Sequence, residues 1–320
     1  MRKTPVAAVV LTIVALLLAG CGSDDDNGGS SAATSTTVAD GGSGAAAFPV
    51  TVEDASGSVT IDAEPQKIVS LAPSLTETLF AVGAGDQVVA VDDQSNYPED
   101  APTTDLSGYE PNVEAIGGYE PDLVVFSDDP GDLATGLEKI GVQTLVLPAA
   151  TDLEETYRQI EVVGDATGHA DEADDLVDTM KTKFEELEAE VPDGDPVTYF
   201  HELDDTLYTV TSKSFIGELY AMAGFENIAD AADPEGTGYP QLSAEYLIEQ
   251  DPQAIFLADA KCCGQSAETV AARPGWSTLQ AVQDGNVFVL DDDVASRWGP
   301  RVVELFETIV EARQQIDAAA

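Results

Sequence analysis

The chain has 320 residues and carries 60 acidic against 13 basic side chains, which gives a net charge of −47 at neutral pH. Such a charge repels nucleic acid and anionic membrane surfaces, so we expect neither as a partner. The acidic residues are spread along the sequence rather than gathered in one block, which indicates a heavily solvated surface.

The first 21 residues have the pattern of an export signal. Arg2 and Lys3 form a basic start, and an apolar run over residues 6–18 follows, too short for a comfortable transmembrane span. The run ends in LAGC, which resembles a bacterial lipobox. That resemblance implies a signal peptide over residues 1–21 and a lipid on Cys21, which would anchor the protein to a membrane without spanning it. The alternative is an ordinary secretory signal with a chance cysteine.

Residues 22–48 are predicted to be a disordered tether. Up to residue 47 this stretch consists largely of Gly, Ser, Thr, Ala and Asp, and Val38 is its only large apolar side chain. Such a composition cannot bury enough surface to fold. A flexible segment of this length would hold a folded body away from a lipid surface.

Residues 49–168 alternate strands with helices, which predicts an α/β lobe with a parallel sheet. The expected elements are the strand KIVSLAP, the helix SLTETLFAVGAG, the strand QVVAV, the helix PGDLATGLEKIG and the strand VQTLVLP. In the first helix, Ser74 and Glu77 have the spacing of a capping box, and Gly83 follows the expected end.

Residues 169–192 are predicted to form one long helix. Apolar side chains recur there at steps of three and four residues, which makes a single stripe along a helix from Ala170 to Glu190. This helix contains no glycine or proline that would bend it. It would link the first lobe to a second one as a rigid rod.

Residues 193–320 repeat the same alternation and predict a second α/β lobe. The expected elements are the strands PVTYF and LYTV, the helices SFIGELYAMAGF and WSTLQAVQDG, the strand NVFVLD and the closing helix PRVVELFETIVEARQQI. One unit occurs in both lobes: NVEAIGGYEPDLVVFSD in the first and SAEYLIEQDPQAIFLAD in the second, with Glu114 and Glu245 matched at an offset of 131 residues. The sequence therefore predicts two Rossmann-like lobes joined by one long helix, with a ligand cleft between them.

Several blocks, in order, resemble one family of proteins. They are KIVSLAPSLTETLFAVG, SNYPEDA, NVEAIGGYEPDLVVF, YPQLSAEYLIEQDPQAIF, RPGWSTLQAVQDGNVFVLD and SRWGPR. Together they are similar to the substrate-binding proteins of ABC importers for vitamin B12, ferric siderophores and haem, the group with a long helical backbone. The resemblance implies an extracytoplasmic, lipid-anchored, monomeric receptor that delivers its ligand to a two-fold permease with its ATPase. It further implies that Glu114 and Glu245, one on each lobe, dock onto arginines of that permease.

The same resemblance implies aromatic ligand contacts. Tyr97 and Tyr239 match positions where the B12-binding members carry aromatic residues in the cleft, and Tyr109 follows Gly108, at or beside which another such aromatic falls. Aromatic faces supply contact area at low entropic cost. The alternative is that these tyrosines anchor loops of their own lobes.

The loop before the last helix supplies the polar contacts. Asp293 and Arg297 match an aspartate and an arginine that reach the ligand in the family, and Trp298 is expected beside them. The alternatives are a surface ion pair for Arg297 and a core position for Trp298. Arg301 and Glu304 are expected to pair on the helix surface. The aspartate, the arginine and the aromatic positions favour a corrinoid, and a ferric siderophore or haem is the alternative ligand.

Cys262 and Cys263 are adjacent and directly follow an expected strand, so they should lie at the rim of the cleft. In an exported protein a vicinal disulfide is the leading interpretation. We predict no metal site, since only His169 and His201 could assist and no zinc spacing is present. His169 is expected to precede or cap the long helix, and His201 is a hypothetical axial ligand for haem. We expect no resident cofactor, the metal centre belonging to the bound corrinoid or iron chelate itself.

An enzyme is not predicted. The sequence contains no G-x-S-x-G elbow and no phosphate-binding P-loop, and GAGDQV lacks the third glycine of a dinucleotide motif. A structural surface lipoprotein is the more distant alternative. It would need no aromatic side chains in a cleft and would bind no small ligand.

Overall fold

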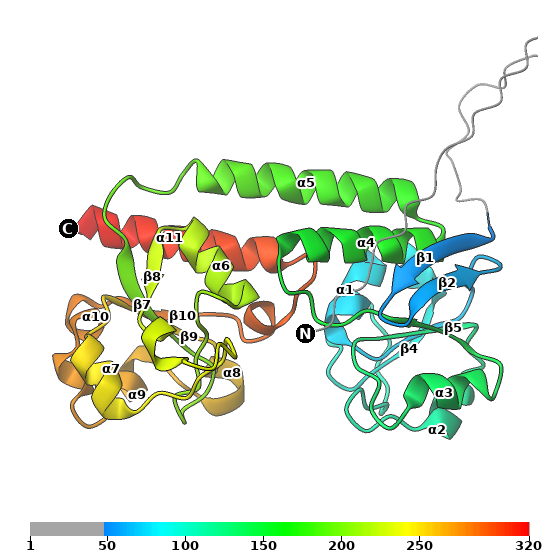
Figure 1. Ribbon diagram of the computed structural model, residues 1–320, viewed down its shortest axis with the longest axis horizontal. Coiled ribbons are helices and arrows are strands. Elements are labelled where there is room, and N and C mark those ends of the chain that lie inside the picture. The colour runs from blue at the N-terminus through cyan, green and yellow to red at the C-terminus, as the bar shows by residue number, and fades with distance from the viewer. Residues whose placement is uncertain (1–47, 320) are drawn as a thin grey trace, which may run out of the picture. The chain divides into compact units, whose positions relative to one another are not determined.

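The computed structural model describes residues 48–319 (Figure 1). The predicted signal peptide with Cys21, and the predicted tether up to residue 47, lie outside the described residues.

The first lobe contains a four-stranded parallel sheet in the order β4-β3-β5-β6. Its strands are β3 (Ile68–Ser70), β4 (Val88–Val91), β5 (Leu123–Phe126) and β6 (Gln143–Val146). The helices are α1 (Pro73–Ala81), η1 (Ala84–Gln87), α2 (Val113–Gly117), α3 (Leu133–Glu138) and α4 (Leu153–Thr167). The strands are almost entirely buried, as expected for a parallel sheet covered on both faces.

An antiparallel hairpin precedes this sheet and was not predicted. It consists of β1 (Val50–Asp54) and β2 (Gly57–Ile61). The side chains of Val52 and Ile61 are buried in the core. The turn is held against edge strand β6, because Ala55 N donates to the carbonyl of Val146 at 3.0 Å and Val146 N donates to Asp54 Oδ2 at 2.8 Å. The folded body thus begins with a hairpin that covers the edge of the sheet.

The predicted capping box of α1 is wrong. Its N-cap is Ala72, without a side-chain hydrogen bond, and the helix starts on a proline. Neither Ser74 nor Glu77 caps the helix, since the Glu77 carboxylate is directed to the second lobe. Gly83 lies just beyond the end of α1 with φ 91°, a left-handed conformation that glycine adopts without strain.

The second lobe contains another four-stranded parallel sheet, in the order β10-β9-β7-β8. Its strands are β7 (Val197–Glu202), β8 (Phe225–Asn227), β9 (Ala254–Leu257) and β10 (Val287–Val289). The helices are α6 (Phe215–Met222), η2 (Asp230–Ala232), α7 (Ala244–Gln250), α8 (Ala260–Cys263), α9 (Ala267–Ala271), η3 (Trp276–Thr278), α10 (Gln280–Asp284), η4 (Val294–Ser296) and α11 (Val302–Ala319).

One strand assignment in this lobe is wrong. The stretch LYTV forms only an isolated bridge, between Tyr208 and Gln241. The fourth strand is β8 instead, which has three residues and a single buried side chain, Phe225. Such a short strand has no apolar run that a pattern could detect.

Helix α5 (Ala170–Glu188) joins the two lobes and is close to the predicted Ala170–Glu190. In Figure 1 it lies along α4 of the first lobe and α11 of the second, and it contacts both. Its buried stripe includes Phe184, whose ring stacks on Phe306 of α11 with centroids 4.9 Å apart. Two α/β lobes linked by one long helix confirm the predicted fold class. The residue limits 49–168 and 193–320 stay predictions, with each sheet falling inside one of them.

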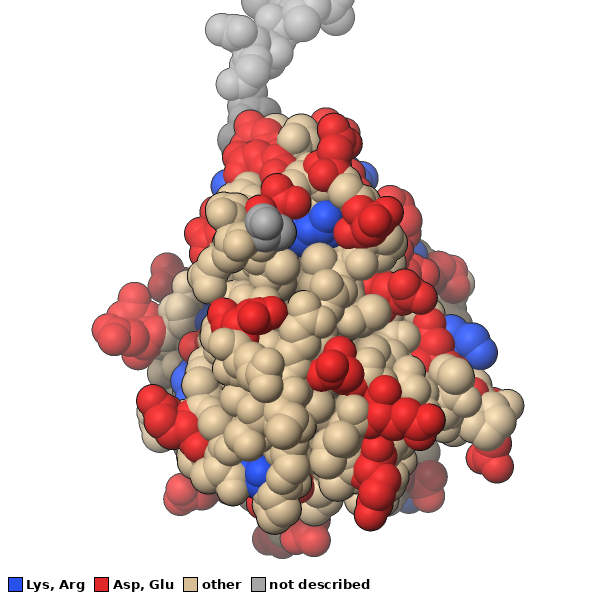
Figure 2. All heavy atoms as spheres, turned by 90° about the vertical axis from the view of Figure 1, so that its left-hand side faces the viewer, with Lys and Arg blue, Asp and Glu red and all other residues tan. Residues whose placement is uncertain are grey.

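The surface of the described residues is acidic. Figure 2 shows Asp and Glu side chains scattered over the face at the second-lobe end, with few Lys or Arg between them. Within residues 48–319, no helix is both long and apolar enough to cross a bilayer.

Candidate functional site

A cavity of about 380 Å³ opens between the two lobes. From the first lobe it is lined by segments that follow β3, β4, β5 and β6, and from the second by the segment between β10 and α11. Loops at the carboxyl ends of parallel strands are where α/β lobes bind ligands. The polar and aromatic side chains used below are Asp92, Tyr109, Asp128, Asp293, Arg297 and Trp298.

The structure brings together four of the six expected ligand contacts, namely Tyr109, Asp293, Arg297 and Trp298. Tyr97 and Tyr239 do not line this cavity and are 44% and 45% exposed. Instead, the guanidinium of Arg301 packs over the Tyr97 ring, 4.1 Å from the ring centroid. A ligand role for Tyr97 and Tyr239 stays a prediction.

Gly108 and Tyr109 are neighbours in one loop at the cavity, and only the second can present a side chain to a ligand. A Cβ atom on Gly108 would lie 2.5 Å from the carbonyl oxygen of Leu71 and 3.0 Å from Asp92 Oδ2, so this position cannot hold a side chain without moving the backbone. The next residue, Tyr109, is 81% exposed and lines the cavity. The aromatic surface of this loop is therefore provided by Tyr109.

Arg297 is not free to bind a ligand, because its side chain is 8% exposed and its guanidinium is hydrogen-bonded to protein atoms. Its Nη1 donates to Glu77 Oε1 and Asn96 Oδ1, each at 2.8 Å. Its Nη2 donates to the carbonyl of Gln94 at 3.0 Å and to Asp293 Oδ1 at 2.9 Å. Three of these four acceptors belong to the first lobe, so Arg297 ties the lobes together.

Glu77 is the first-lobe partner of two arginines and is only 3% exposed. Arg301 donates to it through Nε at 2.8 Å and Nη2 at 2.6 Å, which raises the pKa of Arg301. The predicted pairing of Arg301 with Glu304 is therefore wrong. We call Glu77, Asp293, Arg297 and Arg301 the interlobe latch. It contains two carboxylates and two guanidinium groups.

Glu114 and Glu245 occupy equivalent exposed positions on the two lobes. Each is the second residue of a short helix, α2 or α7, whose first turn is capped by the side chain of Asn112 or Ser243. In Figure 1, both helices lie on the side of their lobe away from α5. The duplicated unit thus places one exposed carboxylate on the corresponding helix of each lobe.

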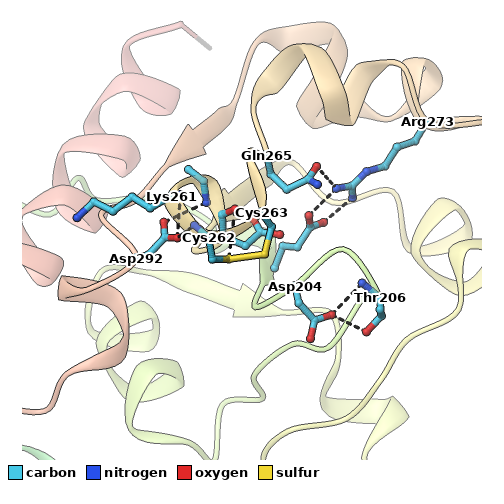
Figure 3. The surroundings of a disulfide bond; sticks show 11 residues. Asp204, Thr206, Lys261, Cys262, Cys263, Gln265, Arg273 and Asp292 are labelled. Carbon is cyan, nitrogen blue, oxygen red and sulfur yellow. Dashed lines mark hydrogen bonds and ion pairs between the residues drawn. A yellow bond between two sulfur atoms is a disulfide. The ribbon is translucent and has the colours of Figure 1, made fainter. Parts of the chain in front are cut away.

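Cys262 and Cys263 form the vicinal disulfide that the sequence indicates. Both lie in α8, after the carboxyl end of β9, and are exposed. The Asp292 carboxylate accepts from the backbone N–H groups of this turn, from Ala260 at 3.0 Å, Lys261 at 2.8 Å and Cys262 at 2.9 Å (Figure 3). The turn that contains the disulfide is therefore held in place by the loop that follows β10.

Reduction of this disulfide is expected to change the melting temperature by less than about 2 °C. A disulfide stabilises a protein mainly by closing a loop in the unfolded chain, and adjacent cysteines close almost none. Thermal unfolding with and without a phosphine reductant measures the shift. The double variant Cys262→Ser with Cys263→Ser controls for other effects of the reductant, and a loss of about 5 °C or more in the wild type alone would contradict the expectation.

Two carboxyl groups near α8 are fully buried: Asp259 immediately precedes this helix, and Glu202 is the last residue of β7. Arg273 donates to Glu202 from both terminal nitrogens, each at 2.5 Å. Among the described residues, no group donates a hydrogen bond to either oxygen of Asp259, and its polar neighbour, the Glu202 carboxylate, can only accept one from a protonated Asp259. Burial, together with the charge of Glu202, raises the pKa of Asp259 to about 7. Asp259 is thus a buried acid that stays protonated well above its ordinary range.

We expect this group to make stability fall as the pH rises. The folded protein keeps the Asp259 proton up to about pH 7, whereas the unfolded chain loses it near 3.8, so the free energy of unfolding declines between these values. Asp259→Asn should remove this decline. The free energy of unfolding of the variant minus that of the wild type should therefore be about 1–3 kcal/mol larger at pH 8 than at pH 4. Urea unfolding at both pH values tests this. The exposed Asp175→Asn on α5 is the control, and equal pH dependence in wild type and Asp259→Asn would contradict the expectation.

The hypothesis that His201 is an axial haem ligand is wrong. Its side chain is completely buried, and Nδ1 bonds with the Tyr220 hydroxyl at 2.9 Å. Burial lowers the pKa of His201 to about 3, so the imidazole is neutral. His169 immediately precedes α5 but does not cap it with its side chain. Within residues 48–319, no group of three or more His, Cys, Asp or Glu side chains is arranged to hold a metal ion.

A family model for periplasmic binding proteins matches residues 68–294, and the chain belongs to this family. It is 33% identical over 276 residues to an uncharacterized ABC transporter substrate-binding lipoprotein of Bacillus subtilis, covering 83% of this chain and 85% of that protein. It is 32% identical over 272 residues to a cobalamin-binding protein of Halobacterium salinarum, covering 81% and 73%.

Solved structures agree with this assignment. The periplasmic vitamin B12 binding protein of Vibrio cholerae superposes with a TM-score of 0.66 at 26% identity, over 79% of this chain and 98% of that one. A periplasmic heme-binding protein from Roseiflexus has a TM-score of 0.69 at 21% identity, over 80% and 99%, which shows the shared fold alone. The chain is thus the substrate-binding component of an ABC importer. Its relatives are non-enzymatic periplasmic solute-binding proteins, and they include proteins named for binding vitamin B12 or heme and one from an Fe3+-hydroxamate transport system.

Proposed function

We propose that this protein captures a corrinoid of the vitamin B12 type outside the cytoplasmic membrane and delivers it to the permease of its importer. The observation that carries this proposal is the 32% identity, over 81% of the chain, to a cobalamin-binding protein. The buried position of His201 removes that side chain as an axial haem ligand. A ferric siderophore or haem is the alternative ligand within the family.

The cavity offers chemistry that suits the rim of a corrin ring. Tyr109 presents an exposed aromatic face, which supplies contact area to a large ligand. Asp128 and Asp293 present carboxylate oxygens, which accept hydrogen bonds from the side-chain amides of a corrinoid. A cavity of about 380 Å³ encloses part of such a ligand, and the rest would extend along the open cleft between the lobes.

Uptake of labelled cyanocobalamin tests this function in cells. Deleting the gene should lower the initial uptake rate at nanomolar ligand, and a plasmid copy should restore it. Labelled ferric siderophore and haem form parallel arms. Normal corrinoid uptake in the deletion strain, with loss of uptake of an iron chelate, would overturn the corrinoid assignment in favour of the alternative.

We also propose that Cys21 carries a lipid that anchors the protein to the membrane. The expected result for Cys21→Ser is release of the protein from the membrane pellet into the extracytoplasmic soluble fraction. A variant that stays in the pellet as the wild type does would contradict lipid anchoring at this cysteine.

A further inference from the structure

The charges of the interlobe latch cancel one another. Glu77 and Asp293 face Arg297 and Arg301 in contacts of 2.6–2.9 Å. Asp293 also accepts from Lys261 at 3.1 Å. The arginine at the cavity wall is therefore already neutralised by protein carboxylates, and little of its positive charge is left for a ligand.

Two further carboxylates line the cavity without a basic partner among residues 48–319. Asp92 is buried, with Oδ1 accepting from Ser95 Oγ at 2.5 Å and Oδ2 directed against Gly108. Asp128 is exposed and is the second residue after the end of β5. Burial and the neighbouring Asp93 raise the pKa of Asp92, while Ser95 and the more distant charge of Arg297 oppose the rise. The cavity thus holds an excess of negative charge.

We propose that Asp92 and Asp128 make the cleft select ligands by charge, favouring neutral and cationic ligands over anionic ones. This inference rests on the proposed corrinoid function and deepens it. Carboxylates in a partly enclosed cleft act through a lower dielectric than bulk water, and the net charge of −47 adds a long-range field of the same sign. Aquacobalamin, with charge +1, is therefore preferred over neutral cyanocobalamin, and haem with its two propionates is disfavoured.

The two cobalamins differ mainly in their axial ligand and charge, which makes them a matched pair of probes. Titrating the purified protein at pH 7 and low salt should give a Kd for aquacobalamin at least about fivefold lower than for cyanocobalamin. Two carboxylates roughly 8 Å away would have this effect even at the dielectric of bulk water. The ratio should approach one at 1 M salt, where the screening length is about 3 Å. Equal affinities at both salt concentrations, or tighter binding of cyanocobalamin, would overturn the inference. A changed aquacobalamin spectrum on binding would also overturn it, since a side chain would then have replaced the axial water.

Variants assign the effect to the cavity. Asp128→Asn, at an exposed position where folding is not at stake, should lower the low-salt ratio about twofold, and Asp92→Asn with Asp128→Asn should bring it close to one. Asp175→Asn on the exposed face of α5 removes the same charge far from the cavity and should leave the ratio unchanged. If Asp175→Asn lowers the ratio as much as Asp128→Asn, the selectivity comes from net charge and the assignment to Asp92 and Asp128 is wrong.

Failure of the proposed function would be recognised separately. If neither cobalamin binds, the corrinoid proposal falls, and the charge inference is tested with ferrioxamine B, of net charge +1, against ferric enterobactin, of net charge −3. Tighter binding of ferrioxamine B supports charge selection. Tighter binding of ferric enterobactin overturns it, and no binding of any of the four ligands overturns both proposals.

Discussion

Replacing Glu114 and Glu245 together with arginine is expected to abolish ligand uptake while leaving ligand affinity and melting temperature close to those of the wild type. Both side chains are exposed, on α2 and α7, so their loss removes no buried contact. A single exposed ion pair contributes only about 0–1 kcal/mol. Two pairs matched to a two-fold permease would still set the orientation of docking, because charge complementarity fixes register and reversed charges repel.

Uptake of labelled ligand in the deletion strain, complemented with each variant, measures this effect. Each single change should give an intermediate loss, as expected for a bivalent contact. The control is Glu172→Arg with Glu186→Arg, which makes the same change of charge at exposed positions on α5, on the other side of the lobes. Wild-type uptake by the variant at Glu114 and Glu245 would show that these glutamates have no docking role.

The second large effect is expected at the interlobe latch. Glu77→Ala should lower the free energy of unfolding by about 3–5 kcal/mol, because it leaves the buried guanidinium of Arg297 and the half-buried one of Arg301 without their shared carboxylate. Urea unfolding, read from tryptophan fluorescence, measures the difference.

A surface ion pair provides the control for this variant. Glu307 pairs with Lys183 at 3.2 Å, and both side chains are partly exposed. Glu307→Ala should therefore cost less than about 1 kcal/mol. If Glu77→Ala costs no more than Glu307→Ala, the latch does not stabilise the contact between the lobes.

Elements with strong periodicity could be predicted from the sequence. The α5 stripe extends over five turns, and its burial follows the predicted three- and four-residue steps. The hairpin β1–β2 and strand β8 could not be predicted, because each strand is short and buries few side chains. Their positions depend on contacts with distant segments, such as that of Asp54 with β6.

The functional site also depends on contacts between segments that are distant in sequence, which local patterns do not reveal. The positions of Asp293 and Arg297 at the cavity follow from the family resemblance, but the role of Arg297 depends on Glu77, 220 residues away in sequence. The local spacing of Glu77 with Ser74 favoured a helix cap, since nothing local reveals a partner on the other lobe. Likewise, every residue of β7 except Thr198 is buried, so the pattern could not tell which face His201 occupies.

We propose that this protein is a corrinoid receptor. Titration of the purified protein with cyanocobalamin, a panel of ferric siderophores and haemin, followed by intrinsic fluorescence and calorimetry, tests it most directly. We predict saturable binding of cyanocobalamin at one ligand per chain and much weaker binding of haemin. Saturable binding of an iron chelate, with no response to any corrinoid, would contradict the claim.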